Sequence, residues 1–103
     1  MGNRNLQHVQ HHILICNGES CFRNRGDEVT LTIREQIADL KADEYIHTTR
    51  TRCNGRCNEA CVVIVYPEGD WYRNMTPSEG KQLVSDLLNK TRLVKDKAFH
   101  SFK

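Results

Sequence analysis

The stretch from residue 61 to residue 73, CVVIVYPEGDWYR, decides the expected fold, because it reads as two strands joined by a tight turn. Residues 61–66 are almost entirely apolar and rich in β-branched side chains, which predicts a buried strand. Pro67 fixes φ at the second position of a type I turn, and Gly69 can take the left-handed position of a bulged hairpin loop. We therefore expect residues 70–73 to run antiparallel to residues 61–66.

Two further strands and a helix are expected on the N-terminal side of this hairpin. Residues 11–16 (HHILIC) have a continuous aliphatic centre, which suits a strand buried on both faces. Residues 45–52 (YIHTTRTR) are rich in β-branched side chains and predict another strand. Between them, apolar residues recur at helical spacing and indicate an amphipathic helix over residues 27–42. Its apolar positions are Val29, Ile33, Ile37 and Leu40.

A second helix is predicted after the hairpin, over residues 77–90. Thr76 is placed as its N-cap, Pro77 at the first helical position, and Glu79 where it closes a capping box. The buried stripe of this helix is expected to consist of Leu83, Val84, Leu87 and Leu88.

The order strand, helix, strand, hairpin and helix predicts an α/β fold. A right-handed crossover makes the first two strands parallel, which gives a mixed four-stranded sheet covered by two main helices. This order is compatible with a thioredoxin-like fold. We expect one domain over residues 11–90, preceded by an N-terminal extension (residues 1–10) and followed by a basic C-terminal tail (residues 91–103) whose packing the sequence leaves open.

Length and composition argue against several classes of protein. The chain has 103 residues, enough for one compact domain, and its 38% hydrophobic and 27% charged residues are near the averages of soluble globular proteins. No apolar run approaches the roughly 20 residues of a membrane span. A net charge of +2 without an aromatic-basic pattern gives no indication of nucleic-acid binding. The polar start lacks the apolar core of a signal peptide, so we expect a cytoplasmic protein without structural disulfides.

Five cysteines carry the strongest functional signal. Cys16 and Cys21 form one close pair, Cys53 and Cys57 form another, and each pair follows a predicted strand. Cys61 makes the number odd, so the cysteines of one chain cannot all pair as disulfides. The Cys-x-x-Cys redox motif at a helix start is missing, which argues against dithiol exchange. Paired thiolates can converge on a metal, and their spacing alone slightly favours a structural zinc site.

Other metal-ligating and catalytic patterns are weak. No histidine stands beside a cysteine pair, so we interpret all five as surface or strand residues. They are His8, His11, His12, His47 and His100. The sequence has no phosphate-binding glycine loop, no nucleophile elbow and no further ligands for a catalytic metal, so we expect no independent enzyme activity.

Four segments together resemble the thioredoxin-like [2Fe-2S] ferredoxins. They are residues 11–16, residues 50–57 (RTRCNGRC), residues 62–72 (VVIVYPEGDWY) and residues 76–79 (TPSE). This family is similar to the small iron-sulfur subunit of NADH dehydrogenases and hydrogenases, and some relatives are associated with cobalamin biosynthesis in bacteria. The resemblance implies a one-electron carrier that docks transiently on redox partner proteins. Family members often dimerise, so the resemblance also implies a homodimer.

The same resemblance implies four ligands for the [2Fe-2S] cluster, matched position by position: Cys16, Cys21, Cys53 and Cys57. The chain departs from the family at Ala60 and Cys61, where related sequences tend to carry Gly-Pro. We interpret Cys61 as a small buried residue outside the ligand set, with ligand exchange and oxidation chemistry as open alternatives.

Residues around the ligand loops are expected to tune the cluster. Gly18 and Gly55 lie inside the two loops, where a missing side chain lets backbone N–H groups approach sulfur. Five arginines bracket the loops and either stabilise the reduced cluster or are solvated or paired with nearby acids. These are Arg23, Arg25, Arg50, Arg52 and Arg56. Trp71 and Tyr72 either contribute to docking and dimerisation or belong to the core.

Two alternatives use the same four thiolates. One is a zinc-stabilised interaction module without redox activity, and the other is an iron-sulfur sensor or accessory protein. Visible absorption that bleaches on reduction separates an iron-sulfur protein from the colourless zinc form.

Overall fold

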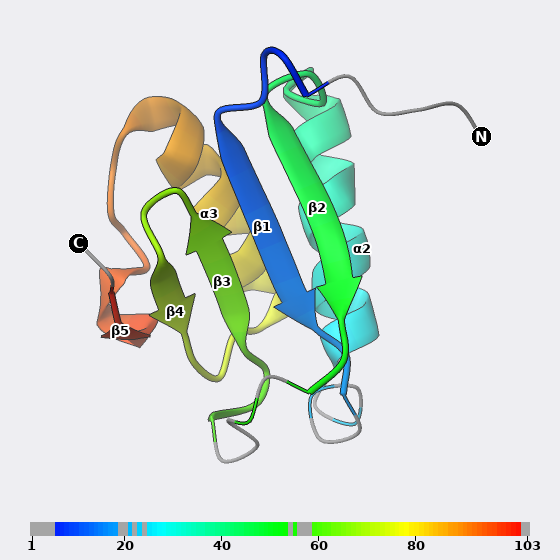
Figure 1. Cartoon of the computed structure of the whole chain (residues 1–103), viewed down its shortest axis with the longest axis vertical. Coiled ribbons are helices and arrows are strands. Elements are labelled where there is room, and N and C mark those ends of the chain that lie inside the picture. The colour runs from blue at the N-terminus through cyan, green and yellow to red at the C-terminus, as the bar shows by residue number, and fades with distance from the viewer. Residues whose placement is uncertain are drawn as a thin grey trace.

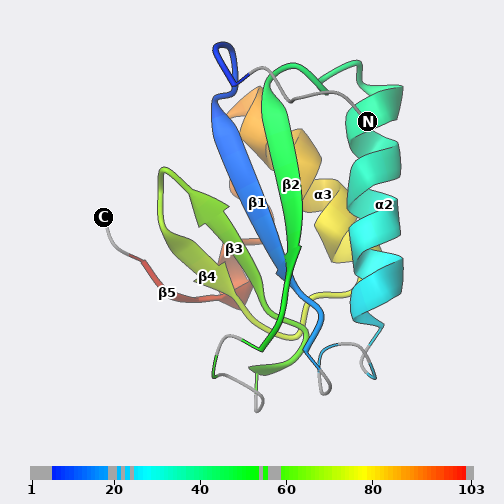
Figure 2. The same cartoon turned by 45° about the vertical axis from the view of Figure 1, so that its right-hand side comes forward.

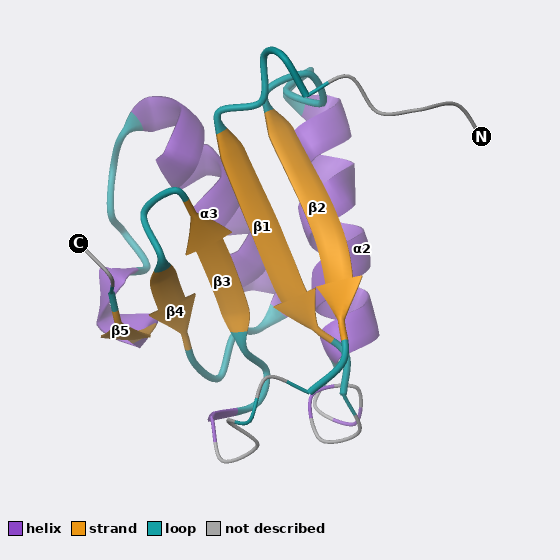
Figure 3. Cartoon of the chain, in the orientation of Figure 1, coloured by secondary structure: helices purple, strands orange, loops and turns teal. Residues whose placement is uncertain are grey.

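Five strands form one mixed sheet, and two helices lie side by side on one of its faces (Figure 1, Figure 2). The computed structural model describes residues 6–18, 21, 23, 25–53, 55 and 59–101. None of the helices in these ranges is long and apolar enough to cross a membrane. Figure 3 colours the elements by type, which in chain order are β1 (His11–Cys16), α2 (Gly26–Asp39), β2 (Ile46–Thr51), β3 (Val63–Tyr66), β4 (Asp70–Tyr72), α3 (Pro77–Asn89), the 3-10 helix η2 (Lys95–Lys97) and β5 (Ala98–His100).

The sheet has the strand order β2-β1-β3-β4-β5. β1 and β2 are parallel, with Ile13 opposite Thr48, and the other neighbouring strands are antiparallel. The predicted crossover and the predicted hairpin are therefore confirmed. The prediction of four strands is wrong, because β5 in the basic tail pairs with β4 and adds a fifth strand.

Alternate residues of β1 form the core together with the helices. Ile13 and Ile15 of β1 are fully buried, as are Val29 and Ile33 of α2. Burying a side chain of this size contributes about 2 kcal/mol relative to leaving it exposed. The two helices approach closely at Gly80 of α3, where an added Cβ would lie 2.9 Å from Cγ1 of Ile33. The core thus depends on a small residue at the helix contact as well as on large ones in the sheet.

The opposite face of the sheet is less buried than predicted. His12 and Leu14 alternate with the core residues of β1 and are half-buried. Both α2 and α3 lie on the other side of the sheet (Figure 2), so the expectation that β1 is buried on both faces is wrong. Trp71 lies on this second face, opposite Ile64 of β3, and its ring makes an edge contact with Phe99.

The local signals around α3 are confirmed. The Thr76 hydroxyl accepts a hydrogen bond from the Glu79 N–H, and the Glu79 carboxylate accepts one from the Thr76 N–H, which completes the capping box. Gly69 has the predicted left-handed conformation, with φ of 71°. The peptide bond between Tyr66 and Pro67 is cis, which the sequence analysis did not predict.

Helix α2 ends earlier than predicted. Its last residue is Asp39, and Lys41 takes a left-handed conformation with φ of 55°. The Ala42 N–H then donates to the Ile37 carbonyl, which satisfies one of the last helical acceptors. Leu40 is 44% exposed, so its predicted place in the core is wrong.

Candidate metal centre

Both cysteine pairs begin at one edge of the sheet, because β1 and β2 are parallel neighbours. Cys16 is the last residue of β1, and Cys53 follows the end of β2 at Thr51. The Asn17 N–H donates to the Thr51 carbonyl at 2.8 Å, and the Cys16 N–H donates to the Val62 carbonyl at 3.0 Å. Hydrogen bonds therefore hold the ends of β1 and β2 beside the segment that leads into β3, at the lower end of the sheet in Figure 1.

Gly18 brings the two cysteine loops into contact. A Cβ added at Gly18 would lie 2.8 Å from both the Cα and the N of Cys53, a distance that real side chains do not adopt. Gly26, the first residue of α2, packs equally closely against the first loop, because an added Cβ would lie 2.7 Å from the Cys21 carbonyl oxygen. Only residues without a side chain allow the backbone to be this compact around the cysteines.

Three of the cysteines are buried together. Cys16, Cys21 and Cys61 are 3%, 2% and 1% exposed, whereas Cys53 is exposed. Cys16 Sγ lies 3.4 Å from the Arg52 carbonyl oxygen, and Cys61 Sγ lies 3.8 Å from the Cys16 carbonyl oxygen. The Cys21 thiol is a near neighbour of both the Cys16 and the Cys61 thiols. These thiols are thus buried between the end of β1 and the segment that leads into β3.

Burial makes these thiols hard to ionise in the absence of a cation. Desolvation is the main cause that raises the pKa of Cys21 to about 12, and the neighbouring Cys16 thiol raises it further. Desolvation and then Cys16 raise the pKa of Cys61 to about 11. A hydrogen bond from the Val62 backbone opposes the shift at Cys21, because an N–H donor stabilises a thiolate.

Backbone donors are directed at sulfur in both loops. The Gly55 N–H donates to Cys53 Sγ at 3.2 Å, and the Val62 backbone is hydrogen-bonded to the Cys21 side chain. The predicted approach of the Gly55 N–H to sulfur is therefore present, but an added Cβ would meet no atom within 4 Å, so the left-handed φ of 79° is what favours glycine there. Gly18 instead serves the close approach of the two loops. Donors of this kind stabilise negative charge on sulfur and so suit metal thiolates.

Two of the predicted arginines pair with acids on α2. Arg25 Nη2 lies 2.7 Å from Glu28 Oε2, and Arg50 Nη2 lies 2.8 Å from Asp27 Oδ1. Of the alternatives for these arginines, pairing with nearby acids is therefore the correct one for Arg25 and Arg50. Arg56 lies outside the described residues.

The structure brings together part of the predicted ligand set. Cys16 and Cys21 are in contact, and Cys53 lies on the adjoining loop against Gly18. Cys57 lies outside the described residues, and within the described ranges no three metal-ligating side chains gather around one point. The proximity of Cys61 to Cys21 was not predicted.

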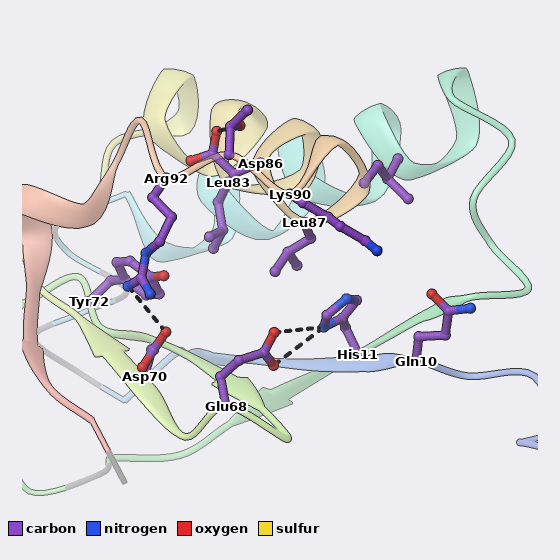
Figure 4. A pocket seen from close by; sticks show the side chains of 12 residues that line it. Gln10, His11, Glu68, Asp70, Tyr72, Leu83, Asp86, Leu87, Lys90 and Arg92 are labelled. Atoms are coloured by element: carbon purple, nitrogen blue, oxygen red, sulfur yellow. Dashed lines mark hydrogen bonds and ion pairs between the residues drawn. The ribbon is translucent and has the colours of Figure 1, made fainter. Parts of the chain in front are cut away.

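A cavity of about 370 Å³ lies at the other end of β1, and none of the cysteines that the structure describes lines it (Figure 4). The hairpin and the C-terminal part of α3 form its walls, with His11 Nδ1 3.2 Å from Glu68 Oε2 and Arg92 Nη2 3.5 Å from Asp70 Oδ2. The carboxylate of Asp86 is buried beside it. It accepts hydrogen bonds from Thr91 Oγ1 at 2.7 Å, Gln82 Nε2 at 3.1 Å and the Val94 N–H at 3.2 Å.

The aromatic pair of β4 belongs mainly to the core. Tyr72 is 5% exposed, and its pKa is raised to about 12 by burial first and then by Asp70. Trp71 is half-buried and packs against the core as well as against Phe99 and His100. Of the two interpretations of these aromatics, packing is the one that the structure supports.

Comparison with known proteins places this geometry in a family. Residues 4–88 match the family model of the thioredoxin-like [2Fe-2S] ferredoxins. A protein of Priestia megaterium named as a 2Fe-2S ferredoxin is 52% identical over 84 residues, which cover 82% of this chain and 65% of the relative. The chain thus spans slightly less than two thirds of that relative. A 2Fe-2S ferredoxin of Clostridium pasteurianum is 29% identical over 94 residues, which cover 84% of this chain and 92% of the relative.

The fold is also that of a solved ferredoxin structure. The thioredoxin-like [2Fe-2S] ferredoxin of Aquifex aeolicus superposes with a TM-score of 0.84 at 25% sequence identity, over 92% of this chain and 94% of the other. The sequence match, the thioredoxin-like sheet and the thiols gathered at its edge agree with one another. The chain belongs to the thioredoxin-like [2Fe-2S] ferredoxin family.

Proposed function

We propose that this protein is a one-electron carrier that holds a [2Fe-2S] cluster on four thiolates, those of Cys16, Cys21, Cys53 and Cys57. The observation that carries the proposal is the contact between Gly18 and the Cys53 backbone, which joins the two cysteine loops at one edge of the sheet. Thiolate sulfur is the usual ligand of such clusters. When bound, the cluster takes up and releases one electron, which is the chemistry that this family uses.

The surroundings of the sulfurs support this assignment. The thiols of Cys16 and Cys21 are buried, and the pKa of Cys21 is raised to about 12, so a cation is needed to make the buried thiolate stable. The N–H groups of Gly55 and Val62 point to the sulfurs of Cys53 and Cys21 and offset part of the negative charge. Both the donor atoms and their hydrogen-bond partners therefore fit a metal thiolate centre.

The exposure of Cys53 suggests where redox partner proteins dock. Cys53 is exposed, whereas Cys16 and Cys21 are buried, so we infer that electrons reach the surface through the loop that carries Cys53. We place transient docking at this edge, in a cytoplasmic carrier without a substrate site of its own. A homodimer through another face leaves the edge accessible.

Anaerobic purification after iron-replete expression tests the proposal. The expected product is red-brown, contains two irons and two sulfides per chain, and loses its visible absorption on addition of dithionite. The zinc alternative predicts a colourless protein with one zinc per chain, because four thiolates also suit zinc. Stoichiometric zinc in a protein that neither colours nor bleaches would overturn the electron-carrier function.

A further inference from the structure

We propose that Lys97, in the C-terminal tail, is a positioning residue for the second cysteine loop, the one that carries Cys53 and Cys57. It acts through the linker between β4 and α3, residues 73–75. The inference rests on the proposed function, because it bears on electron transfer only if this loop holds the cluster. The tail lies beyond residues 4–88, which match the family model, so membership of the family does not imply this role.

The linker holds the chain where it leaves the second cysteine loop. The Asn74 N–H donates to the Glu59 carbonyl at 2.9 Å. The next residue, Met75, donates its N–H to the Cys61 carbonyl at 3.0 Å. Glu59 follows Cys57 by only two residues along the chain. The position of the linker therefore restricts how far this end of the loop can move.

Lys97 binds the same linker from the side of the tail. Its carbonyl accepts a hydrogen bond from the Arg73 N–H at 2.8 Å, and its ammonium group donates to the Asn74 carbonyl at 3.2 Å. Asn74 is thus hydrogen-bonded to the loop through its N–H and to the tail through its carbonyl. It also has a φ of 49°, a left-handed conformation that residues other than glycine seldom adopt. Hydrogen bonds on both sides help to keep its backbone in this conformation.

Glu79 of α3 fixes the Lys97 ammonium group. Lys97 Nζ lies 3.2 Å from Glu79 Oε2, and the two side chains are 32% and 28% exposed. The other carboxylate oxygen, Oε1, accepts from the Thr76 N–H at 3.1 Å, so the capping box orients the acid. A partly buried ion pair is screened less by salt than an exposed one. The pair therefore holds the ammonium group beside the Asn74 carbonyl.

Other contacts keep the tail in place without the Lys97 ammonium group. Ala98 lies opposite Tyr72 of β4, and the Arg73 guanidinium carbon lies 5.1 Å from the centre of the Phe99 ring. Loss of the ammonium group alone should therefore leave β5 paired with β4. Its effect should be confined to the linker and to the loop that the linker holds.

Without this ammonium group, the linker should open more often. The group supplies one charged hydrogen bond to the linker at a partly exposed site, so its loss should raise the open population about fivefold, which is equivalent to about 1 kcal/mol. Local openings of this kind occur without global unfolding. Because a ligand loop must move before iron is lost, we expect the cluster to be lost faster by a similar factor.

Lys97→Met tests this role, because methionine keeps an apolar side chain and removes the ammonium group. Lys95→Met is the matched control, since Lys95 lies in the same 3-10 helix, η2, but is exposed. Hydrogen–deuterium exchange of the purified, cluster-loaded proteins is measured by mass spectrometry in peptides that cover the linker and in peptides that cover β1. The decay of visible absorption in a chelator is measured on the same samples. In K97M, linker exchange and cluster loss should both be about fivefold faster with β1 unchanged, and K95M should match the wild type.

A second variant reaches the same contact from α3. Glu79→Gln keeps the Oε1 acceptor of the capping box but removes the charge that fixes Lys97. It should speed linker exchange and cluster loss in the same direction as K97M, by a smaller factor.

Three results would contradict the role of Lys97. Linker exchange at the wild-type rate in K97M would show that Lys97 does not hold the linker, and an equal rise in β1 would show a loss of global stability instead. Faster linker exchange with cluster loss at the wild-type rate would show that the linker does not hold the loop. A colourless wild type would overturn the proposed function instead, and linker exchange, which needs no cluster, would still test the Lys97 contact.

Discussion

β1 carries a polar cluster at each end, and the two clusters differ in how their polar groups are satisfied. At the His11 end, Asp86 accepts three hydrogen bonds and Asp70 faces the Arg92 guanidinium (Figure 4). At the Cys16 end, three cysteines are buried near one another, and burial raises the pKa of Cys21 to about 12. The carboxylates of the first cluster are neutralised by hydrogen bonds and an ion pair within this chain. The thiols of the second cluster stay buried without a metal only while they are protonated.

Stabilising and functional polar groups differ in this molecule in what neutralises them. A buried carboxylate with all its donors in place contributes to stability, and its removal should cost free energy of unfolding alone. A set of buried thiols with backbone donors directed at sulfur is stable as thiolates only when a cation joins it. Substitutions at the two ends should therefore affect different measurements.

The largest effect is expected when a ligand is removed from the cysteine end. Cys21→Ala should abolish nearly all cluster binding, because a methyl group that cannot bind iron replaces a thiolate ligand, and iron and sulfide analysis after anaerobic purification checks this. Cys61→Ala is the matched control, since it changes an equally buried cysteine but should retain the cluster. A C21A variant with a full complement of iron would contradict the ligand assignment.

Removal of the buried carboxylate at the other end should cost stability without touching the metal centre. Asp86→Ala leaves the donors of Thr91 and Val94 without their acceptor and should lower the free energy of unfolding by about 3 kcal/mol, measured by urea denaturation. The control Asp96→Ala removes an exposed acid and should stay within about 0.5 kcal/mol of the wild type. A D86A variant that folds but loses its iron would break the contrast between the two ends.

The contact between the cysteine loops gives a smaller effect that joins stability to cluster retention. Gly18→Ala places a Cβ 2.8 Å from the Cys53 backbone, so the loops must separate, at a cost of about 2 kcal/mol. Gly55→Ala meets no atom within 4 Å, but its φ of 79° costs about 1 kcal/mol for a side chain. Only Gly18→Ala should also speed cluster loss to a chelator, followed as the decay of visible absorption. Equal decay rates in the two variants would show that loop contact does not hold the cluster.

Local signals were sufficient to predict most of the fold. The capping box of Thr76 and Glu79 and the left-handed Gly69 depend on neighbours a few positions away, and both are present. β5 depends instead on the edge that β4 offers, and a three-residue strand in a basic tail has no periodic pattern of its own. Leu40 fits the helical spacing, but α2 ends before it, so the pattern continues beyond the helix.

The part of the candidate site that lies at the ends of strands could be predicted from the sequence. Parallel pairing of the predicted strands was enough to place Cys16 and Cys53 at one edge of the sheet. The contact of Cys61 with Cys21 requires the register between β1 and β3, which no short motif encodes. The three donors around Asp86 likewise come from residues on α3 and on the segment after it, and their convergence depends on tertiary packing.

The smallest expected effect concerns His12, which follows His11 in β1 and points to the other face of the sheet. Burial, and then the neighbouring His47 ring at 4.9 Å, lower the pKa of His12 below its ordinary value of about 6.5. Below that pH the unfolded chain binds a proton more readily than the folded chain, so this group makes the free energy of unfolding fall as the pH drops from 7 toward 5. His12→Gln keeps a partner for the Thr49 hydroxyl, which lies 2.7 Å from His12 Nε2, and should flatten this pH dependence in urea denaturation. Because His12 lies at the far end of β1 from Cys16, the substitution should leave the midpoint potential unchanged. If the free energy of unfolding of the variant depends on pH as it does in the wild type, His12 is not the group that causes this dependence.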